Sequence, residues 1–137
     1  MNIYVEKGAY APNRAHKTDA GLDIRSRETR LVKAHSSALF HTGLHVQLLQ
    51  GTAGLLVSKS GLNVNHGITS TGLIDEGYTG EIMVKLYNHS DENYLVNVGD
   101  KISQLVVIPV FYEDVHFVDS LDENTERGDK GLGSSGK

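Results

Sequence analysis

The sequence predicts an all-β fold, a jelly-roll-like β-sandwich. Fifteen glycines stand against two prolines in 137 residues, which indicates many tight turns. Short runs rich in Val, Ile, Leu, Tyr and Phe recur between these turn signals, and each has the length of a strand. No window carries the apolar stripe of a long helix. Together these observations favour two packed layers of antiparallel strands.

Five apolar runs are the expected strands, and the clearest of them alternates with a period of two. In this run Ile82, Val84 and Leu86 share one face, as in a half-buried strand. A short helix is expected through residues 61–65, ended by Gly67. The five predicted strands cover residues 44–49, 54–58, 82–88, 94–98 and 102–111.

The chain divides into a core and a tail. A chain of 137 residues fits one domain that buries about two-thirds of its unfolded surface. From Leu121 onward the sequence is charged and rich in glycine, and it cannot pack a core of its own. We therefore expect a jelly-roll core over residues 1–120 and a flexible tail over residues 121–137.

Composition excludes several functional classes. The chain has no cysteine, so it has no disulfide framework, thiolate metal site or cysteine nucleophile, which agrees with a reducing cytoplasm. Glu6 and Lys7 interrupt the first apolar stretch, so neither a signal peptide nor a membrane span is expected there. A net charge of -4 argues against broad nucleic-acid binding. A polyanionic small substrate would need a local basic site.

Residues 72–81 carry the first chemical motif. Asp75 and Tyr78 stand between Gly72, interpreted as a turn glycine, and a strong strand. A loop held by strands can aim a carboxylate as a general base. The structural alternative is that Asp75 only closes a turn.

Three further segments suit a phosphorylated ligand with a metal ion. Residues 19–24 set two acids around a glycine, which suits a hard cation. Residues 58–61 offer a cation, hydroxyls and a glycine amide that an anion can approach. Residues 99–105 turn into a strand and present Gln104 as an amide donor, although most such turns are structural.

The tail carries a further group of phosphate donors, whereas the histidines form no recognisable site. Residues 127–136 combine cations, backbone amides and two hydroxyls, the donors that a triphosphate requires, without the spacing of a P-loop. A mobile lid fits this pattern. The seven histidines form no zinc motif, and we interpret them as surface or structural residues. His41 and His45 are four residues apart, but their segment is typical of a strand, in which this spacing does not imply that the two side chains converge.

Taken in order, these five segments resemble the five motifs of the trimeric dUTP pyrophosphatase family. The resemblance spans residues 19–136. It implies a jelly-roll subunit, a homotrimer and active sites that are each assembled from three chains. It also implies a dUTP diphosphatase activity that yields dUMP and pyrophosphate, which limits uracil in DNA and supplies dUMP for thymidylate synthesis.

The first, second and fourth motifs would hold the phosphates and Mg²⁺. By resemblance, Asp23 contacts Mg²⁺ through water while the substrate's phosphates ligate the ion. Lys59, Ser60 and Gly61 stand where the family usually has arginine, serine and glycine, so the forked phosphate contact of arginine is replaced by a point charge. Gln104 matches the glutamine that contacts the α-phosphate.

The third motif would supply the base and the nucleoside pocket. By resemblance, Asp75 activates the water that attacks the α-phosphorus, and Tyr78 lies under the deoxyribose. The segment 68–75 is interpreted as the hairpin whose backbone reads uracil. Its expected contacts are Gly72, Leu73 and Ile74, with Met83 nearby.

The fifth motif would close the site from a neighbouring subunit. By resemblance, Arg127, Ser134 and Ser135 contact the β- and γ-phosphates. Leu132 occupies the position where most members have a phenylalanine stacked on uracil.

Two rival functions remain open. A dCTP deaminase shares the trimeric fold but uses a glutamate, whereas Asp75 in its Gly-Leu-Ile-Asp context favours the pyrophosphatase. A dUTP-binding regulator that controls a protein partner is the second rival. The filled catalytic positions favour catalysis, and a regulatory role added to it stays open.

Overall fold

The computed structural model describes residues 1–121 and residue 125. The regular secondary structure of this part of the chain consists of strands apart from one short helix, so the all-β prediction is confirmed. The elements are β1 (Asn2–Val5), β2 (Leu22–Arg25), β3 (Arg30–Val32), β4 (Ser37–Gln47), β5 (Thr52–Val57), α1 (Ser60–His66), β6 (Ile68–Ile74), β7 (Glu81–Asn88), β8 (Tyr94–Val96) and β9 (Lys101–Pro109). Within the described residues, no helix is both long and apolar enough to cross a membrane.

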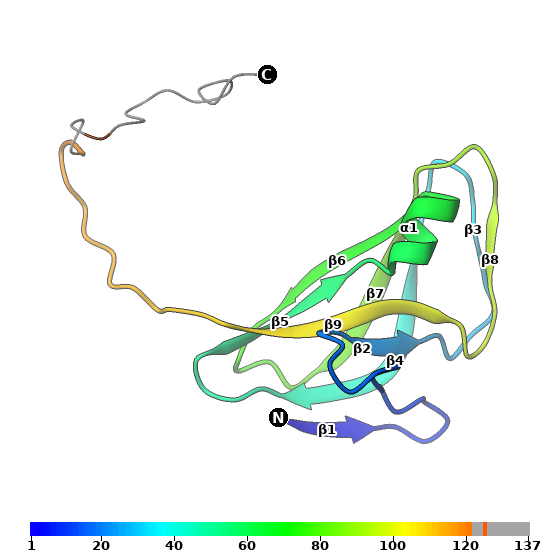
Figure 1. Cartoon of the computed structure of the whole chain (residues 1–137), viewed down its shortest axis with the longest axis horizontal. Coiled ribbons are helices and arrows are strands. Elements are labelled where there is room, and N and C mark those ends of the chain that lie inside the picture. Colours follow the sequence, from blue (N-terminus) through cyan, green and yellow to red (C-terminus); the bar gives the residue numbers. More distant parts are fainter. Residues whose placement is uncertain (122–124, 126–137) are drawn as a thin grey trace.

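Antiparallel pairing joins seven strands into one curled sheet, in the order β1-β4-β7-β6-β5-β9-β2 (Figure 1). Strands β3 and β8 form a separate two-stranded ribbon. The sheet curls at β6, because Ile68 to Ser70 pair with β7 while Thr71 to Ile74 pair with β5. One strand thus joins the two halves of the sheet around the core.

The core is formed by the side chains that point inward at alternate positions along the strands. In β7, Ile82, Val84 and Leu86 are buried while Met83 is 43% exposed, so the predicted alternation is confirmed. Phe40 of β4 packs into the same cluster and is fully buried. Fully burying one apolar side chain of this kind contributes about 1.5–3 kcal/mol. The rigid sheet that results positions the loops described below.

Strand β4 begins earlier than the sequence suggested. Its pairing with β7 shifts register between His41 and His45, and Gly43 in this stretch has a φ of 66°. Four residue steps from His41 to His45 oppose two steps from Met83 to Glu81, so the bulge adds two residues and the same face stays inward on both sides of it, with Ala38, Phe40, Thr42, Leu44 and Val46 buried. Leu49, placed in the predicted strand, is exposed beyond its end.

The hairpin expected over residues 68–75 is wrong. Ile68–Ile74 is one continuous strand, and Gly72 pairs with Leu56 within it. Gly72 is not a turn residue, and its role is close packing, since a Cβ there would lie 3.1 Å from Cδ1 of Leu56. The turn lies instead between β6 and β7, over residues 75–80.

The short helix is confirmed. It covers Ser60–His66 and ends at Gly67, which adopts a left-handed conformation with a φ of 64°. The N–H of Gly67 donates to the carbonyl oxygen of Asn63 at 3.0 Å, as in the usual glycine termination of a helix.

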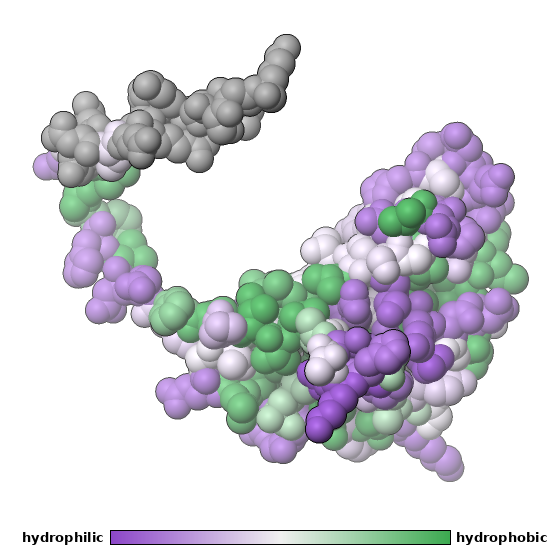
Figure 2. All heavy atoms as spheres, viewed as in Figure 1, coloured by the Kyte–Doolittle hydropathy of each residue, from purple (hydrophilic) through white to green (hydrophobic). Residues whose placement is uncertain are grey.

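Beyond Pro109 the chain leaves the sheet as an extended segment (Figure 1). Figure 2 shows hydrophobic and hydrophilic residues following one another along it. The large apolar side chains exposed between residues 110 and 121 are Phe111, Tyr112, Val115, Phe117, Val118 and Leu121.

Candidate functional site

A cavity of about 320 Å³ lies between β6, β7 and the loop that joins them. Its lining residues come mainly from β6, β7 and the loop, together with Leu39 of β4 and Leu56 of β5. The structure brings together here the residues predicted for the base and the nucleoside pocket: Gly72, Leu73, Ile74, Asp75, Tyr78 and Met83.

The ring of Tyr78 is held in place by its own loop. Its hydroxyl donates to the carbonyl oxygen of Glu81 at 2.9 Å, and its N–H donates to the carbonyl oxygen of Asp75 at 3.1 Å. A Cβ at Gly80 would lie 2.5 Å from the hydroxyl oxygen, so only glycine leaves room for the ring there. Tyr78 is 43% exposed and forms a wall of the cavity that a ligand can contact.

Asp75 also borders a second cavity of about 380 Å³, on the side of Phe111 and Tyr112. Next to it, Glu76 accepts hydrogen bonds from the hydroxyl of Tyr112 at 2.7 Å and from the N–H of Gly51 at 2.8 Å. These bonds, that of Tyr112 first, lower the pKa of Glu76. Sequence reasoning missed this pair, because no local pattern links residues 76 and 112.

A second cluster is built around Asp23. Its side chain is buried on β2, and its two oxygens each form an ion pair with one lysine. The Nζ atom of Lys101 lies 2.7 Å from Oδ2, and Lys59 binds Oδ1. Burial alone would raise the pKa of Asp23, but the hydrogen bonds of Lys101 and Lys59 outweigh burial and lower the pKa. Lys101 belongs to the segment 99–105, in which by resemblance it stands where arginine is common, but its pairing with Asp23 was not predicted.

Gln104 belongs to the same cluster, since it pairs with Asp23 in the ladder of β2 and β9. Its amide Nε2 donates to the carbonyl oxygen of Ser58 at 3.1 Å. A Cβ at Gly21 would lie 2.5 Å from Oε1 of Gln104, so the glycine allows the amide to occupy its position. This contact gives Gly21 a role that residue-type reasoning did not identify.

The segment that begins α1 lies beside this cluster. Lys59 is the residue before the helix and keeps extended backbone angles, with a φ of -70° and a ψ of 127°. Ser60 and Gly61 are exposed, and no atom lies within 4 Å of the position of a Cβ on Gly61. A phosphate can therefore approach the backbone here closely.

Within one chain the two clusters are far apart. Gly54 of β5 pairs with Ile74, so Asp75 lies near Ala53, while Lys59 follows the opposite end of β5. At about 3.3 Å per strand residue, Asp75 and Lys59 are on the order of 15–20 Å apart. A general base must reach its proton directly or through one water. One chain therefore does not bring both clusters to one phosphorus atom.

The residues around Asp23 suit a metal cation that is already bound to a phosphorylated ligand. The described residues contain no group of three His, Cys, Asp or Glu side chains that could hold a metal by themselves. Asp23 offers a single carboxylate amid two ammonium groups. This donor set fits contact through water with a cation that phosphates already ligate. Arg127, Leu132, Ser134 and Ser135 lie outside the described residues.

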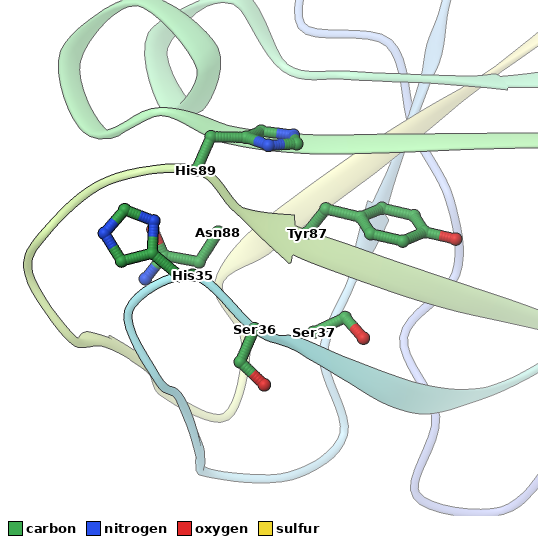
Figure 3. A pocket seen from close by; sticks show the side chains of 6 residues that line it. All are labelled: His35, Ser36, Ser37, Tyr87, Asn88 and His89. Carbon is green, nitrogen blue, oxygen red and sulfur yellow. The ribbon is translucent and has the colours of Figure 1, made fainter.

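Another depression, of about 420 Å³, lies where β4 begins and β7 ends (Figure 3). It contains none of the predicted site residues. The side-chain amide of Asn88 in its wall donates to the carbonyl oxygens of Val32 at 3.1 Å and Glu92 at 2.7 Å. These hydrogen bonds hold neighbouring segments of the fold together. The volume of a cavity alone therefore does not identify the functional site.

Comparison with known proteins agrees with this geometry. The dUTPase family model matches residues 7–136. A deoxyuridine 5'-triphosphate nucleotidohydrolase from Clostridium kluyveri is 43% identical, over 96% of this chain and 94% of that protein. Its counterpart from Candida albicans is 40% identical, over 92% and 80%.

Solved structures show the same fold. Staphylococcus bacteriophage 80alpha dUTPase with dUPNHPP is 31% identical with a TM-score of 0.92, covering 99% of this chain and 98% of that chain. A mutant dUTPase from phage phi11 of S. aureus, which coordinates a structural Mg(II) ion, is 29% identical with a TM-score of 0.80, over 87% and 96%. The predicted jelly-roll class is confirmed by this similarity. The cavity of Asp75 and Tyr78, the cluster of Asp23 and the matches along the whole chain establish that this protein belongs to the dUTPase family.

Proposed function

We propose that the protein hydrolyses dUTP to dUMP and pyrophosphate, with Asp75 as the general base. The observation that carries this proposal is the position of Asp75 at the rim of a cavity lined by Tyr78 and the β6 backbone. The relatives named deoxyuridine 5'-triphosphate nucleotidohydrolase support the same reaction. The activity would limit uracil in DNA and supply dUMP. The absence of cysteine supports a cytoplasmic location.

The cavity suits a deoxynucleoside. Uracil would bind the backbone of Gly72, Leu73 and Ile74, with Met83 on the facing strand. The ring of Tyr78 would fill the space of a ribose 2'-hydroxyl. The Asp75 carboxylate would then take a proton from the water that attacks the α-phosphorus, and pyrophosphate would leave on the opposite side.

The Asp23 cluster suits the phosphates. Lys59 supplies charge, Ser60 and Gly61 supply donors at the start of α1, and Gln104 supplies an amide for the α-phosphate. Mg²⁺ carried by the triphosphate would neutralise developing charge and contact Asp23 through water. Ligand binding then requires the lysine ammonium groups to exchange the carboxylate for phosphate oxygens.

The separation of the clusters supports an active site shared between copies of the chain. Asp75 of one copy would work with Asp23, Lys59 and Gln104 of another, and the fifth-motif residues of the tail, residues 121–137, would come from a third. The row of exposed apolar residues along residues 110–121 suits burial against a second copy. We therefore propose a homotrimer with three such sites.

The test of the reaction is to incubate the purified protein with Mg²⁺ and each deoxynucleoside triphosphate, measuring pyrophosphate and ammonia. Pyrophosphate from dUTP alone is expected. Ammonia from dCTP would identify a deaminase instead. Tight dUTP binding without either product would favour the regulatory alternative.

The phage structures bear on that alternative, because phage dUTPases of this fold are described as controlling transfer of virulence genes. In this chain the presence of Asp75, Tyr78 and the Asp23 cluster favours catalysis. A protein partner would be an addition to hydrolysis.

The shared site has its own test. One inactive variant carries Asp75→Asn, and a second keeps Asp75 but ends at Glu126. Refolding them together in equal amounts should place both intact parts in about a quarter of the sites, because two specified subunits must each be the right variant. Activity should approach a quarter of wild type. If mass spectrometry shows mixed trimers that are no more active than the parents, the shared site is wrong.

A further inference from the structure

His45 lies between two acceptors where β1, β4 and β7 run side by side (Figure 1). In the ladders it stands opposite Tyr4 of β1 and Glu81 of β7. Its Nδ1 atom lies 3.0 Å from the carbonyl oxygen of Thr79, and its Nε2 atom lies 3.2 Å from Oε1 of Glu6. The Tyr4 ring packs beside it at a centroid distance of 5.4 Å. Both ring nitrogens are therefore committed to fixed partners.

The two partners decide the charge of the ring. A carbonyl oxygen and a carboxylate only accept hydrogen bonds, whereas neutral imidazole carries a single N–H. Only the imidazolium form of His45 donates to Glu6 and to Thr79 at once. The Glu6 carboxylate first, and then the Thr79 carbonyl, raises the pKa of His45 accordingly.

The surrounding charges act in the same direction or are already paired. Glu6 also accepts from Nη1 of Arg27 at 2.7 Å, which fixes its carboxylate beside His45. Glu81 faces His45 across the ladder and accepts from Nδ1 of His41 at 2.8 Å. The side chain of His45 is 24% exposed, so these interactions are partly shielded from solvent.

The partner carbonyl belongs to the loop of the active site. Thr79 directly follows Tyr78, in the turn that also begins with Asp75. Within the turn, the N–H of Tyr78 donates to the carbonyl oxygen of Asp75. The bond from His45 joins the later part of this loop to β4, a strand inside the sheet. The loop is therefore tethered to a residue outside it, His45 of the sheet.

We propose that His45, as an imidazolium held by Glu6, is a positioning residue that anchors the loop of Asp75 and Tyr78 through the Thr79 carbonyl. Deprotonation leaves a single N–H, which stays on Nε2 because the charged Glu6 carboxylate is the stronger acceptor. With Glu6 ionised, the anchor is therefore present below about pH 6.5, the ordinary pKa of histidine, and is lost as pH rises through the higher pKa of the folded protein. Loss of the anchor should disorder the loop and weaken the selection of dUTP over UTP. The effect on selection rests on the proposed function, whereas the effect on the order of the loop does not.

Loop order is tested by amide hydrogen exchange at Tyr78, measured by NMR in the wild type and in His45→Gln. One lost hydrogen bond corresponds to exchange faster by about tenfold in the variant at pH 6. The ratio of the two rates should fall toward one as pH rises, because the wild type then loses its anchor. Taking the ratio cancels the intrinsic pH dependence of exchange.

Two further variants make the test specific. Glu6→Gln keeps an acceptor but removes the charge, so it should move the midpoint of the wild-type pH profile to lower pH. His41→Gln alters the same strand without touching Thr79, and Tyr78 should exchange at the wild-type rate. Amides of β5 and β9 should exchange normally in all three variants, which excludes general unfolding.

The kinetic counterpart is the ratio of kcat/KM for dUTP to that for UTP, which should fall several-fold in His45→Gln at pH 6. Unchanged exchange at Tyr78 in His45→Gln, or a pH profile that Glu6→Gln does not move, would overturn the anchor. A wild-type protein that does not hydrolyse dUTP would instead overturn the proposed function, and the exchange result would still decide the role of His45.

Discussion

Replacing Asp23 by asparagine should destabilise the protein, because it leaves two ammonium groups facing each other without a counter-ion. Asp23 is 3% exposed, and its oxygens accept charge-assisted hydrogen bonds from Lys59 and Lys101. Such a bond contributes about 1.5–3 kcal/mol. The lysine side chains are 26% and 34% exposed, so they regain water when the carboxylate is lost, which keeps the total cost below the sum of two such bonds.

We therefore expect Asp23→Asn to lower the free energy of unfolding by about 2–3 kcal/mol, which is roughly 10 °C in Tm for a chain of this size. The chain has no tryptophan, so circular dichroism in a guanidinium titration is the suitable assay. Both proteins must be compared at one concentration, since the proposed assembly would couple stability to concentration. Lys101→Met is the matched control. It should lower the free energy of unfolding by less than Asp23→Asn does, because Lys59 still neutralises the carboxylate.

The same two ion pairs predict that the stability contributed by Asp23 depends on pH. The two lysines hold the pKa of Asp23 in the folded protein below its ordinary value. The stabilisation is therefore present above about pH 3.9, the unfolded value, and is lost as pH falls through the lower folded pKa. The difference in stability between wild type and Asp23→Asn should shrink in that acidic window. A cost under about 0.5 kcal/mol at neutral pH, or a difference that stays constant into acid, would refute this reasoning.

Three further changes test the site. Asp75→Asn should keep the fold and dUTP binding but lower turnover by about two to four orders of magnitude, measured as pyrophosphate release; near-normal turnover would remove Asp75 from the mechanism. Tyr78→Ala should raise kcat/KM for UTP relative to dUTP, and an unchanged ratio would exclude the steric gate. Gly21→Ala should push the Gln104 amide away and raise KM for dUTP about fivefold, the effect of one weakened hydrogen bond; an unchanged KM would show that Gln104 does not need this space.

The sequence predicted the features that depend on neighbouring residues. Alternation in β7 revealed the inward face, because successive side chains of a strand point to opposite sides. Gly67 marked the end of α1, since glycine adopts the left-handed angles that stop a helix. Asp75 and Tyr78 were placed in one site because they belong to one loop.

Only the tertiary structure decided the features that join distant segments. Gly72 resembles a turn residue in sequence, yet pairing with Leu56 keeps it in a continuous strand. Lys101 reaches Asp23, and His45 reaches Thr79, because strand pairing brings together positions that no local pattern relates. The wide separation of Asp75 from the Asp23 cluster also follows from strand register. Periodicity reports which face a residue occupies, whereas pairing and curl of the sheet determine which residues meet, and these depend on the whole chain.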